Sequence, residues 1–135
     1  MHEFPTHRRE SGDDRRLAIA AAARDIIVEK GLEGLRTRDI AARVGINIAT
    51  LHYHVPTKEA LVALVADSIR VEFKAQARRR SREGKTALQL LRMEFEDFAE
   101  SLTDAPDLIV VMAELSERAR RDDGIAAIID PMRMF

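Results

Sequence analysis

Residues 37–58, TRDIAARVGINIATLHYHVPTK, contain the pattern that decides the fold, which is a pair of short helices joined by a turn. Gly45 follows Val44 at the end of the first helical pattern, and glycine takes the positive φ angle that ends a helix without a clash from a Cβ atom. Asn47 precedes the second pattern, where its side-chain oxygen can accept a hydrogen bond from a free backbone N–H group as an N-cap. A glycine-containing turn between two such helices is typical of the helix-turn-helix motif.

The apolar side chains of this motif are spaced so that they can meet in a small core. We expect Ile40, Val44, Ile46 and Leu51 to close it, and Ala41 is small enough for the second helix to cross nearby. No acidic residue lies between positions 40 and 58, which suits contact with a phosphate backbone. The side chains left to face a partner are those of Thr37, Arg38, Asn47, Ile48, Ala49, Thr50, His52, Tyr53 and His54.

Residues on both sides of the turn extend this pattern into a longer signature. Its members are Ile40-Ala41, Gly45-Ile46, residues 50–55 (TLHYHV) and 58–61 (KEAL), and upstream Arg16, Ile19, Ala20, Ala23, Ile26, Ile27, Gly31 and Leu35. Together they resemble the DNA-binding domain of the tetracycline-repressor (TetR) family of transcriptional regulators, over roughly residues 15–67. His52 departs from the family pattern, which usually has a tyrosine there. A hydroxyl contact to phosphate would therefore be replaced by an imidazole contact or lost.

The resemblance implies how the second helix would read DNA. Residues 47–54 would lie in the major groove, with Ile48, Ala49 and Thr50 next to base edges and Arg38 able to reach a guanine edge. The phosphate contacts that fix the register would come from Thr37, His52, Tyr53, His54 and Lys58. The resemblance also implies a homodimer on a palindromic operator, with repression as the commoner outcome and release by a small-molecule effector.

The two histidines of this helix have an alternative role. His52 and His54 are two residues apart, which is about 200° around a helix, so one of them can be a buried or capping histidine. The same geometry prevents them from binding one metal ion together. We therefore expect no metal site, and nothing in the sequence indicates a cofactor.

The composition favours an all-α fold. The chain has 135 residues with 6 Gly and 4 Pro, and it has no alternating run of β-branched residues long enough for a sheet. The absence of cysteine excludes disulfides and thiolate metal sites, which is compatible with a cytoplasmic protein. The longest apolar runs are far shorter than the roughly 20 residues of a membrane span, so we expect no membrane association.

The net charge of −1 conceals an uneven distribution. Residues 62–83 are basic and residues 84–135 are acidic, while residues 1–61 are nearly balanced. DNA affinity must then come from local placement of a few cations. The candidates are Arg15, Arg16, Arg36, Arg38, Arg43 and Lys58. The arginines of residues 78–82 could contact flanking phosphates, although a solvated helix end is the more common role of such a run.

We divide the chain into four segments. They are a mobile arm at 1–14, a helix-turn-helix DNA-binding domain at 15–61, a connecting helix at 62–83 and a C-terminal helical regulatory domain at 84–135 that is apparently truncated. The first helix should span Arg15 to Lys30, with Asp13 or Asp14 as its cap and a stripe of Leu17, Ala20, Ala23 and Ile27. Further helices should follow at 58–80, 86–102, from Pro106 to Gly124 and at 125–129.

The C-terminal segment carries apolar stripes that include Leu88, Leu91, Phe95, Phe98 and Leu102. The resemblance implies a ligand pocket inside this domain and final helices that form a dimer interface, and those final helices are absent. We expect either a fragment of a longer protein or a shortened member with another dimer surface, because an uncovered apolar stripe tends to associate. The candidate pocket residues are Met93, Phe95, Phe98 and Met112.

Two other classes of function remain as alternatives. An enzyme is disfavoured because the sequence has no Ser-His-Asp pattern, Gly-rich phosphate loop, cysteine nucleophile or metal triad. The stronger alternative is a helical protein-interaction module, meaning a shortened family member that has lost DNA binding or forms mixed dimers. A specific, salt-sensitive DNA complex would distinguish the regulator from the interaction module.

Overall fold

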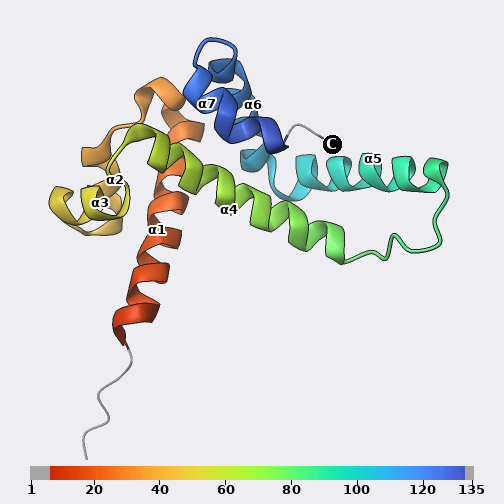
Figure 1. Cartoon of the computed structure of the whole chain (residues 1–135), viewed down its shortest axis with the longest axis horizontal. Helices are drawn as coiled ribbons and strands as arrows, with labels where there is room; N and C mark the ends of the chain where they lie inside the picture. Colours follow the sequence, from red (N-terminus) through yellow and green to blue (C-terminus); the bar gives the residue numbers. More distant parts are fainter. Residues whose placement is uncertain (1–6, 133–135) are drawn as a thin grey trace, which may run out of the picture. The chain divides into compact units, whose positions relative to one another are not determined.

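The computed structural model describes residues 7–132, with side chains from residue 12 onward. Within this range the chain forms α-helices and short 3-10 helices and no β-strand, so the all-α prediction is confirmed (Figure 1). The helices are α1 (His7–Lys30), η1 (Leu32–Gly34), α2 (Thr37–Val44), α3 (Ile48–His54), α4 (Lys58–Arg78), α5 (Ala87–Asp104), α6 (Pro106–Ala119), α7 (Asp123–Ile129) and η2 (Asp130–Met132). Among the described helices, none combines the length and the apolarity that crossing a bilayer requires.

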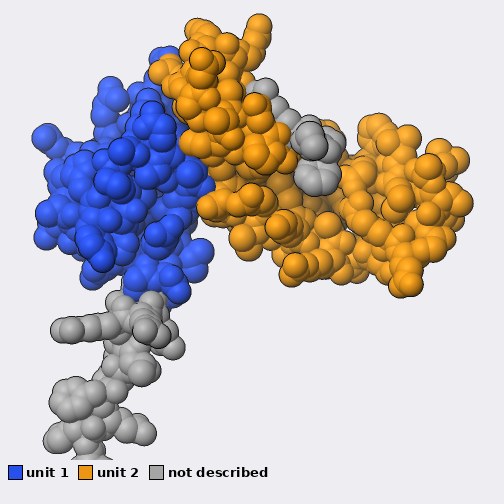
Figure 2. Space-filling view, in the orientation of Figure 1, with its two compact units in different colours: residues 1–65 blue, residues 66–135 orange. Residues whose placement is uncertain are grey.

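The helices form two compact units, Met1–Val65 and Ala66–Phe135, and the division falls within α4 (Figure 2). The N-terminal unit contains α1, α2, α3 and the start of α4, and the C-terminal unit contains the rest of α4 with α5, α6 and α7. Each unit has its own buried apolar core.

The core of the N-terminal unit lies where α1, α2 and α3 meet. Ile19, Ile26 and Ile27 of α1 are almost fully buried, and so are Ile40 of α2 and Leu51 of α3. These side chains are large and apolar, and removing their surface from water is the main force that holds such a small unit together. The remaining buried apolar residues of this unit are Ala20, Ala22, Ala23, Leu32, Ala41, Val55, Leu61, Val62 and Val65.

The first helix differs from its predicted start at Arg15. It begins at His7, and Asp13 and Asp14 therefore lie inside the helix and do not cap it. Arginine and glutamate are good helix formers, so the turn before Asp13 continues the helix in spite of Gly12. Residues 7–14 of the expected mobile arm are thus helical, and residues 1–6 of that arm lie outside the described residues.

The prediction of the buried apolar stripe of α1 is also wrong at its N-terminal end. Leu17 is 65% exposed, whereas Ala20, Ala23 and Ile27 are buried as predicted. Every side chain from position 13 to 18 is exposed, and burial begins at Ile19. Leu17 is on the correct face of the helix, but it lies one turn before the point where the other helices begin to cover α1.

In the C-terminal unit, local signals set the helix starts. Thr86 and Gln89 form a capping box at the start of α5, in which each side chain accepts a hydrogen bond from the backbone N–H group of the other. Pro106 lies in the first turn of α6, as predicted. The buried apolar residues of this unit are Ala66, Ile69, Met93, Leu108, Val111, Leu115, Ala119, Ile125 and Ile129.

The end of α6 was predicted wrongly. The helix stops at Ala119, and Gly124 belongs to α7, which begins at Asp123. The side chain of Asp122 accepts a hydrogen bond from the backbone N–H group of Ile125 at 3.2 Å, so Asp122 is the N-cap of a new helix. This cap, and not a glycine, separates the two helices.

Candidate nucleic-acid interface

The turn between α2 and α3 has the backbone conformation that the sequence predicts. Gly45 is in the left-handed region, with φ 79° and ψ 32°, and its N–H group donates to the carbonyl oxygen of Ala41 at 2.9 Å. The N–H group of Ile46 donates to the same oxygen at 3.0 Å. A Cβ atom at position 45 would meet nothing within 4 Å, so the requirement for glycine comes from φ and not from space.

The start of α3 is fixed by Asn47. Its side-chain oxygen accepts a hydrogen bond from the N–H group of Thr50 at 2.7 Å, which confirms the predicted N-cap. After α3, the hydroxyl of Thr57 accepts a hydrogen bond from the N–H group of Ala60 at 3.0 Å and starts α4 as predicted. Side chains next to α3 in the sequence therefore fix the start of α3 and the start of the helix that follows it.

The burial of the side chains beneath α3 mostly agrees with the core predicted from the sequence. Ile40 and Leu51 are fully buried, and Ala41 is 3% exposed. Val44 and Ile46 are only half-buried, because they lie at the edge of the turn. Leu51 is the one residue of α3 that is buried, so it anchors the helix and leaves the rest of its surface open.

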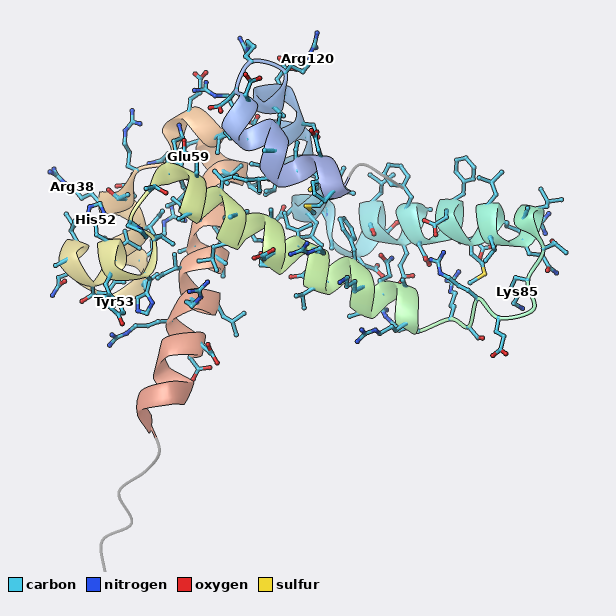
Figure 3. The ribbon with its side chains drawn as sticks, viewed as in Figure 1. Arg38, His52, Tyr53, Glu59, Lys85 and Arg120 are labelled. Carbon is cyan, nitrogen blue, oxygen red and sulfur yellow. The ribbon has the colours of Figure 1, made fainter. Side chains whose placement is uncertain are left out.

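The side chains predicted to contact DNA lie mainly on the open surface. Tyr53 is 84% exposed and Ile48 is 42% exposed, and Figure 3 shows Arg38, His52 and Tyr53 extending away from α2 and α3. Thr37, Arg38, Asn47, Ala49, His52 and Lys58 are exposed, whereas Thr50 and His54 are half-buried. The structure thus brings nine of these ten residues together on α2, on α3 and at its cap, while Lys58 opens α4.

The two histidines of α3 differ in their surroundings. The ring of His54 packs against the edge of Tyr53, with 5.3 Å between the ring centroids and 82° between the planes. His54 is half-buried and His52 is exposed. Of the two, His54 better fits the structural role that the sequence left open, and His52 is free to face a partner.

Several nearby charges have partners within the N-terminal unit. Arg43 of α2 donates hydrogen bonds to both carboxylate oxygens of Glu29 of α1, at 3.1 and 2.6 Å. Lys30 of α1 lies 3.7 Å from Asp39 of α2, and Arg36 donates to the carbonyl oxygen of Glu33. Arg43 is therefore a poor candidate for a phosphate contact. Sequence reasoning missed the pair with Glu29, because no local pattern links residues 14 positions apart.

An open depression of about 340 Å³ lies at the N-terminus of α2, lined by Arg36, Thr37, Arg38 and Asp39. The free N–H groups and the positive end of the helix dipole favour a negative group at such a place. Among the described residues, neither Arg38 nor Lys58 has an ion-pair partner. These two cations are therefore available to a polyanion that approaches α2 and α3, as is Arg36, which donates only to a backbone carbonyl oxygen.

The pair between Glu29 and Arg43 predicts a pH dependence of stability. The hydrogen bonds from Arg43 hold the pKa of Glu29 below its usual value of 4.5, although partial desolvation opposes the shift. A carboxyl group whose pKa is lower in the folded state than in the unfolded state stabilises the fold at pH values above its unfolded-state pKa. This stabilisation is lost as the pH falls through the folded-state pKa. Glu29→Gln should therefore lower the melting temperature slightly at pH 7, and the difference from wild type should vanish in acid below pH 4.5.

Thermal denaturation followed by circular dichroism between pH 7 and pH 3 measures this difference. Asp14→Asn is the matched control, because Asp14 is an exposed carboxylate on the same helix. A difference between wild type and Glu29→Gln that grows in acid would contradict the assignment.

The candidate pocket residues do not share one side of their helix. Met93 is 9% exposed, whereas Phe95 and Phe98 on the outer face of α5 are 67% and 53% exposed. Met112 of α6 is half-buried. A pocket wall formed by Phe95 and Phe98 would therefore be on the opposite side of α5 from Met93.

Comparison with known proteins identifies the N-terminal unit. The model of the family described as "Bacterial regulatory proteins, tetR family" matches residues 19–65, which include α2, α3 and the start of α4. Residues 19–65 thus match the TetR family. The resemblance seen in the sequence is thereby confirmed.

Regulators from several organisms are similar to this chain. The regulator EthR of Mycobacterium tuberculosis (strain ATCC 25618 / H37Rv) is 36% identical over 61 residues, which is 45% of this chain and 28% of EthR. The class D tetracycline repressor of Escherichia coli is 39% identical over 54 residues, which is 40% of this chain and 25% of the repressor. The match thus spans about a quarter of the length of these relatives.

A solved structure extends the similarity beyond the N-terminal unit. The crystal structure of a transcriptional regulator from Rhodococcus sp. Rha1 superposes with a TM-score of 0.71 and 27% sequence identity. The match covers 86% of this chain and 62% of the Rhodococcus chain. The helices that follow the N-terminal unit therefore also have a fold seen in a transcriptional regulator.

Proposed function

We propose that this chain is a TetR-family, DNA-binding transcriptional regulator whose helix α3 lies in the major groove of double-stranded DNA. The observation that carries the proposal is the surface of α3, because Leu51 alone is buried while the other residues of the helix are exposed or half-buried and none of them is acidic. The seven residues of α3 are capped and supported by a compact unit, so the helix can enter a groove without unfolding.

The side chains have separate roles in this proposal. Ile48 and Ala49 contact thymine methyl groups, Thr50 contacts a base or a phosphate, and Arg38 reaches a guanine edge. The remaining residues contact phosphates and set the register of the complex. They are Thr37, Asn47, His52, Tyr53, His54 and Lys58.

The regulator acts as a homodimer on a palindromic operator in the cytoplasm. Two copies of α3 must be about 34 Å apart to enter successive major grooves. A small-molecule effector lowers operator affinity if it binds better to a conformation in which this distance is unsuitable, and repression is the outcome that it would relieve. In this arrangement residues 15–61 bind DNA, residues 62–83 connect, and residues 84–135 regulate. Of the candidate pocket residues, Met93 and Met112 fit an effector site inside the unit, because Phe95 and Phe98 lie on the opposite side of α5 from Met93.

Selection of bound sequences from a random DNA library, followed by gel-shift titration, tests the proposal. We expect enrichment of an inverted repeat, and a binding constant that falls linearly with salt on a log–log plot because bound phosphates release counterions. A scrambled duplex of equal composition is the control. Folded protein that enriches no sequence, or that binds the scrambled duplex equally well, would contradict the proposal.

The exposed apolar face of α5 favours a second candidate function, which is a helical protein-interaction module. Five large apolar side chains on this helix are between 49% and 67% exposed. If the chain acts only through this face, it should associate with other proteins and leave the selected DNA unshifted. The same gel shift, run with folded protein, separates the two functions.

A further inference from the structure

His52 is the histidine of α3 whose ring has no partner within the described part of the chain. The residue is exposed, and Figure 3 shows its side chain extending away from the helix. Among the described residues, no carboxylate oxygen lies within 4 Å of its imidazole nitrogens, and its side chain forms no hydrogen bond. Both ring nitrogens are therefore available to a group outside the protein.

His54 is in a different environment on the same helix. It is half-buried, and its ring packs against the edge of the Tyr53 ring. A neutral imidazole in this position can still donate one hydrogen bond. Because burying a charge is costly, a positive charge is better accommodated on the exposed ring of His52 than on the packed ring of His54.

The place of His52 on α3 suits a contact with a phosphate. His52 follows Ile48 by four residues, so it lies one turn later on the same face of the helix. The N-terminal residues of a recognition helix contact base edges, which leaves the residues of its last turn closer to the border of the groove. In the proposed complex the imidazole of His52 thus meets a phosphate oxygen.

The charged side chains on the elements around α3 are carboxylates, arginines and lysines. They are Glu29 and Lys30 at the end of α1, Arg38, Asp39 and Arg43 of α2, and Lys58 and Glu59 at the start of α4. Two of them, Asp39 and Arg43, are paired with side chains of α1. Side chains of these three types ordinarily keep one charge between pH 6 and pH 8, whereas an imidazole changes its charge in this range.

We propose that α3 takes up a proton at His52 when it binds DNA, so that a protonated imidazole donates a charge-assisted hydrogen bond to a phosphate oxygen. The proton comes from the solvent and remains on the ring. A phosphate next to an imidazole favours the charged form, and a hydrogen bond between ionised groups is roughly twice as strong as one between neutral groups. This inference rests on the proposed function, because it concerns the ionisation of the same DNA complex.

Proton uptake has two consequences for binding. The first is that affinity rises as the pH falls from 8 to 6, by at most about tenfold per pH unit for each imidazole that gains a proton. The second is an additional ionic contact at pH 6, which makes the log–log salt plot steeper by about one for each bound chain. Both effects should disappear together when the ring is replaced, because the same proton causes both.

Fluorescence-anisotropy titration of the selected DNA at pH 8 and pH 6, over a series of salt concentrations, measures both effects. We expect wild type to bind at least about fivefold more tightly at pH 6. His52→Gln keeps a hydrogen-bonding side chain that stays neutral, so its affinity and its salt slope should be the same at both pH values. His54→Gln is the matched control. Whatever its affinity, it should keep the pH dependence of wild type.

His52→Arg tests the role of the charge itself. Arginine carries a positive charge at both pH values, so this variant should bind at pH 8 with the steeper salt dependence that wild type shows at pH 6. Its affinity should not change with pH. Circular dichroism at both pH values establishes that each variant is folded. Should His52→Gln lose its helix signal, His52→Arg carries the same test, because a fixed charge also removes the pH dependence.

Three results would overturn proton uptake at His52 and leave the proposed DNA binding intact. They are equal affinity of wild type at pH 6 and pH 8, a pH dependence that persists in folded His52→Gln or His52→Arg, and a pH dependence that is lost in His54→Gln. Folded wild type that binds no DNA at either pH would instead overturn the proposed function, and this inference with it.

Discussion

Replacing Leu51 by alanine should lower the free energy of unfolding of the N-terminal unit by about 2–5 kcal/mol. Leu51 is fully buried and is the only residue of α3 inside the core. The substitution removes its apolar surface from the core and leaves a cavity beneath the helix, and both effects destabilise the fold. The cost is a large fraction of the stability of a unit of this size.

Amide hydrogen exchange of α1, α2 and α3 measures this effect better than a global melt, because the two units of the chain need not unfold together. Ile48→Ala is the matched control, since Ile48 begins the same helix but is 42% exposed. Its effect should be well below that of Leu51→Ala. Equal protection factors in wild type and Leu51→Ala would show that α3 is not anchored by this side chain.

The helix-turn-helix was predictable because its signals are local. A positive φ at Gly45 and the caps at Asn47 and Thr57 each depend on a few neighbouring residues, so sequence alone placed both ends of the turn. The start of α1 was not predictable, because a charged stretch before Asp13 suits a helix as well as an arm. Propensity alone does not decide between them.

The direction of α5 shows a second limit of sequence reasoning. Its periodicity predicts that Leu88, Phe95 and Phe98 share one face, and they do. Periodicity does not say that this face is the outer one. The inner face is set by ion pairs from Arg79, Arg80 and Arg82, which lie 12 to 21 residues before their partners. These ion pairs, and not the apolar stripe, therefore decide which face of α5 is buried.

The combined substitution Thr50→Ala with Tyr53→Ala should reduce affinity for the selected DNA about a hundredfold while the protein remains folded. Each good contact of this kind to a base or a phosphate contributes on the order of 1–3 kcal/mol, and two are removed. Tyr53 is 84% exposed, so its ring contributes little to the core. The cap of α3 remains, because Asn47 accepts its hydrogen bond from the backbone N–H group of Thr50 and not from the side chain.

The salt dependence of binding distinguishes this loss of affinity from one caused by removing a charged contact to DNA. Neither side chain is charged, so the slope of the log–log salt plot should equal that of wild type, whereas Lys58→Ala should reduce its steepness by about one because Lys58 contacts a phosphate in the proposed complex. Thr103→Ala with Val71→Ala is the matched control, because both residues are exposed and lie in the C-terminal unit. If Thr50→Ala with Tyr53→Ala bound the selected DNA as tightly as this control, α3 could not be the helix that reads the groove, because its highly exposed tyrosine would have no part in the complex.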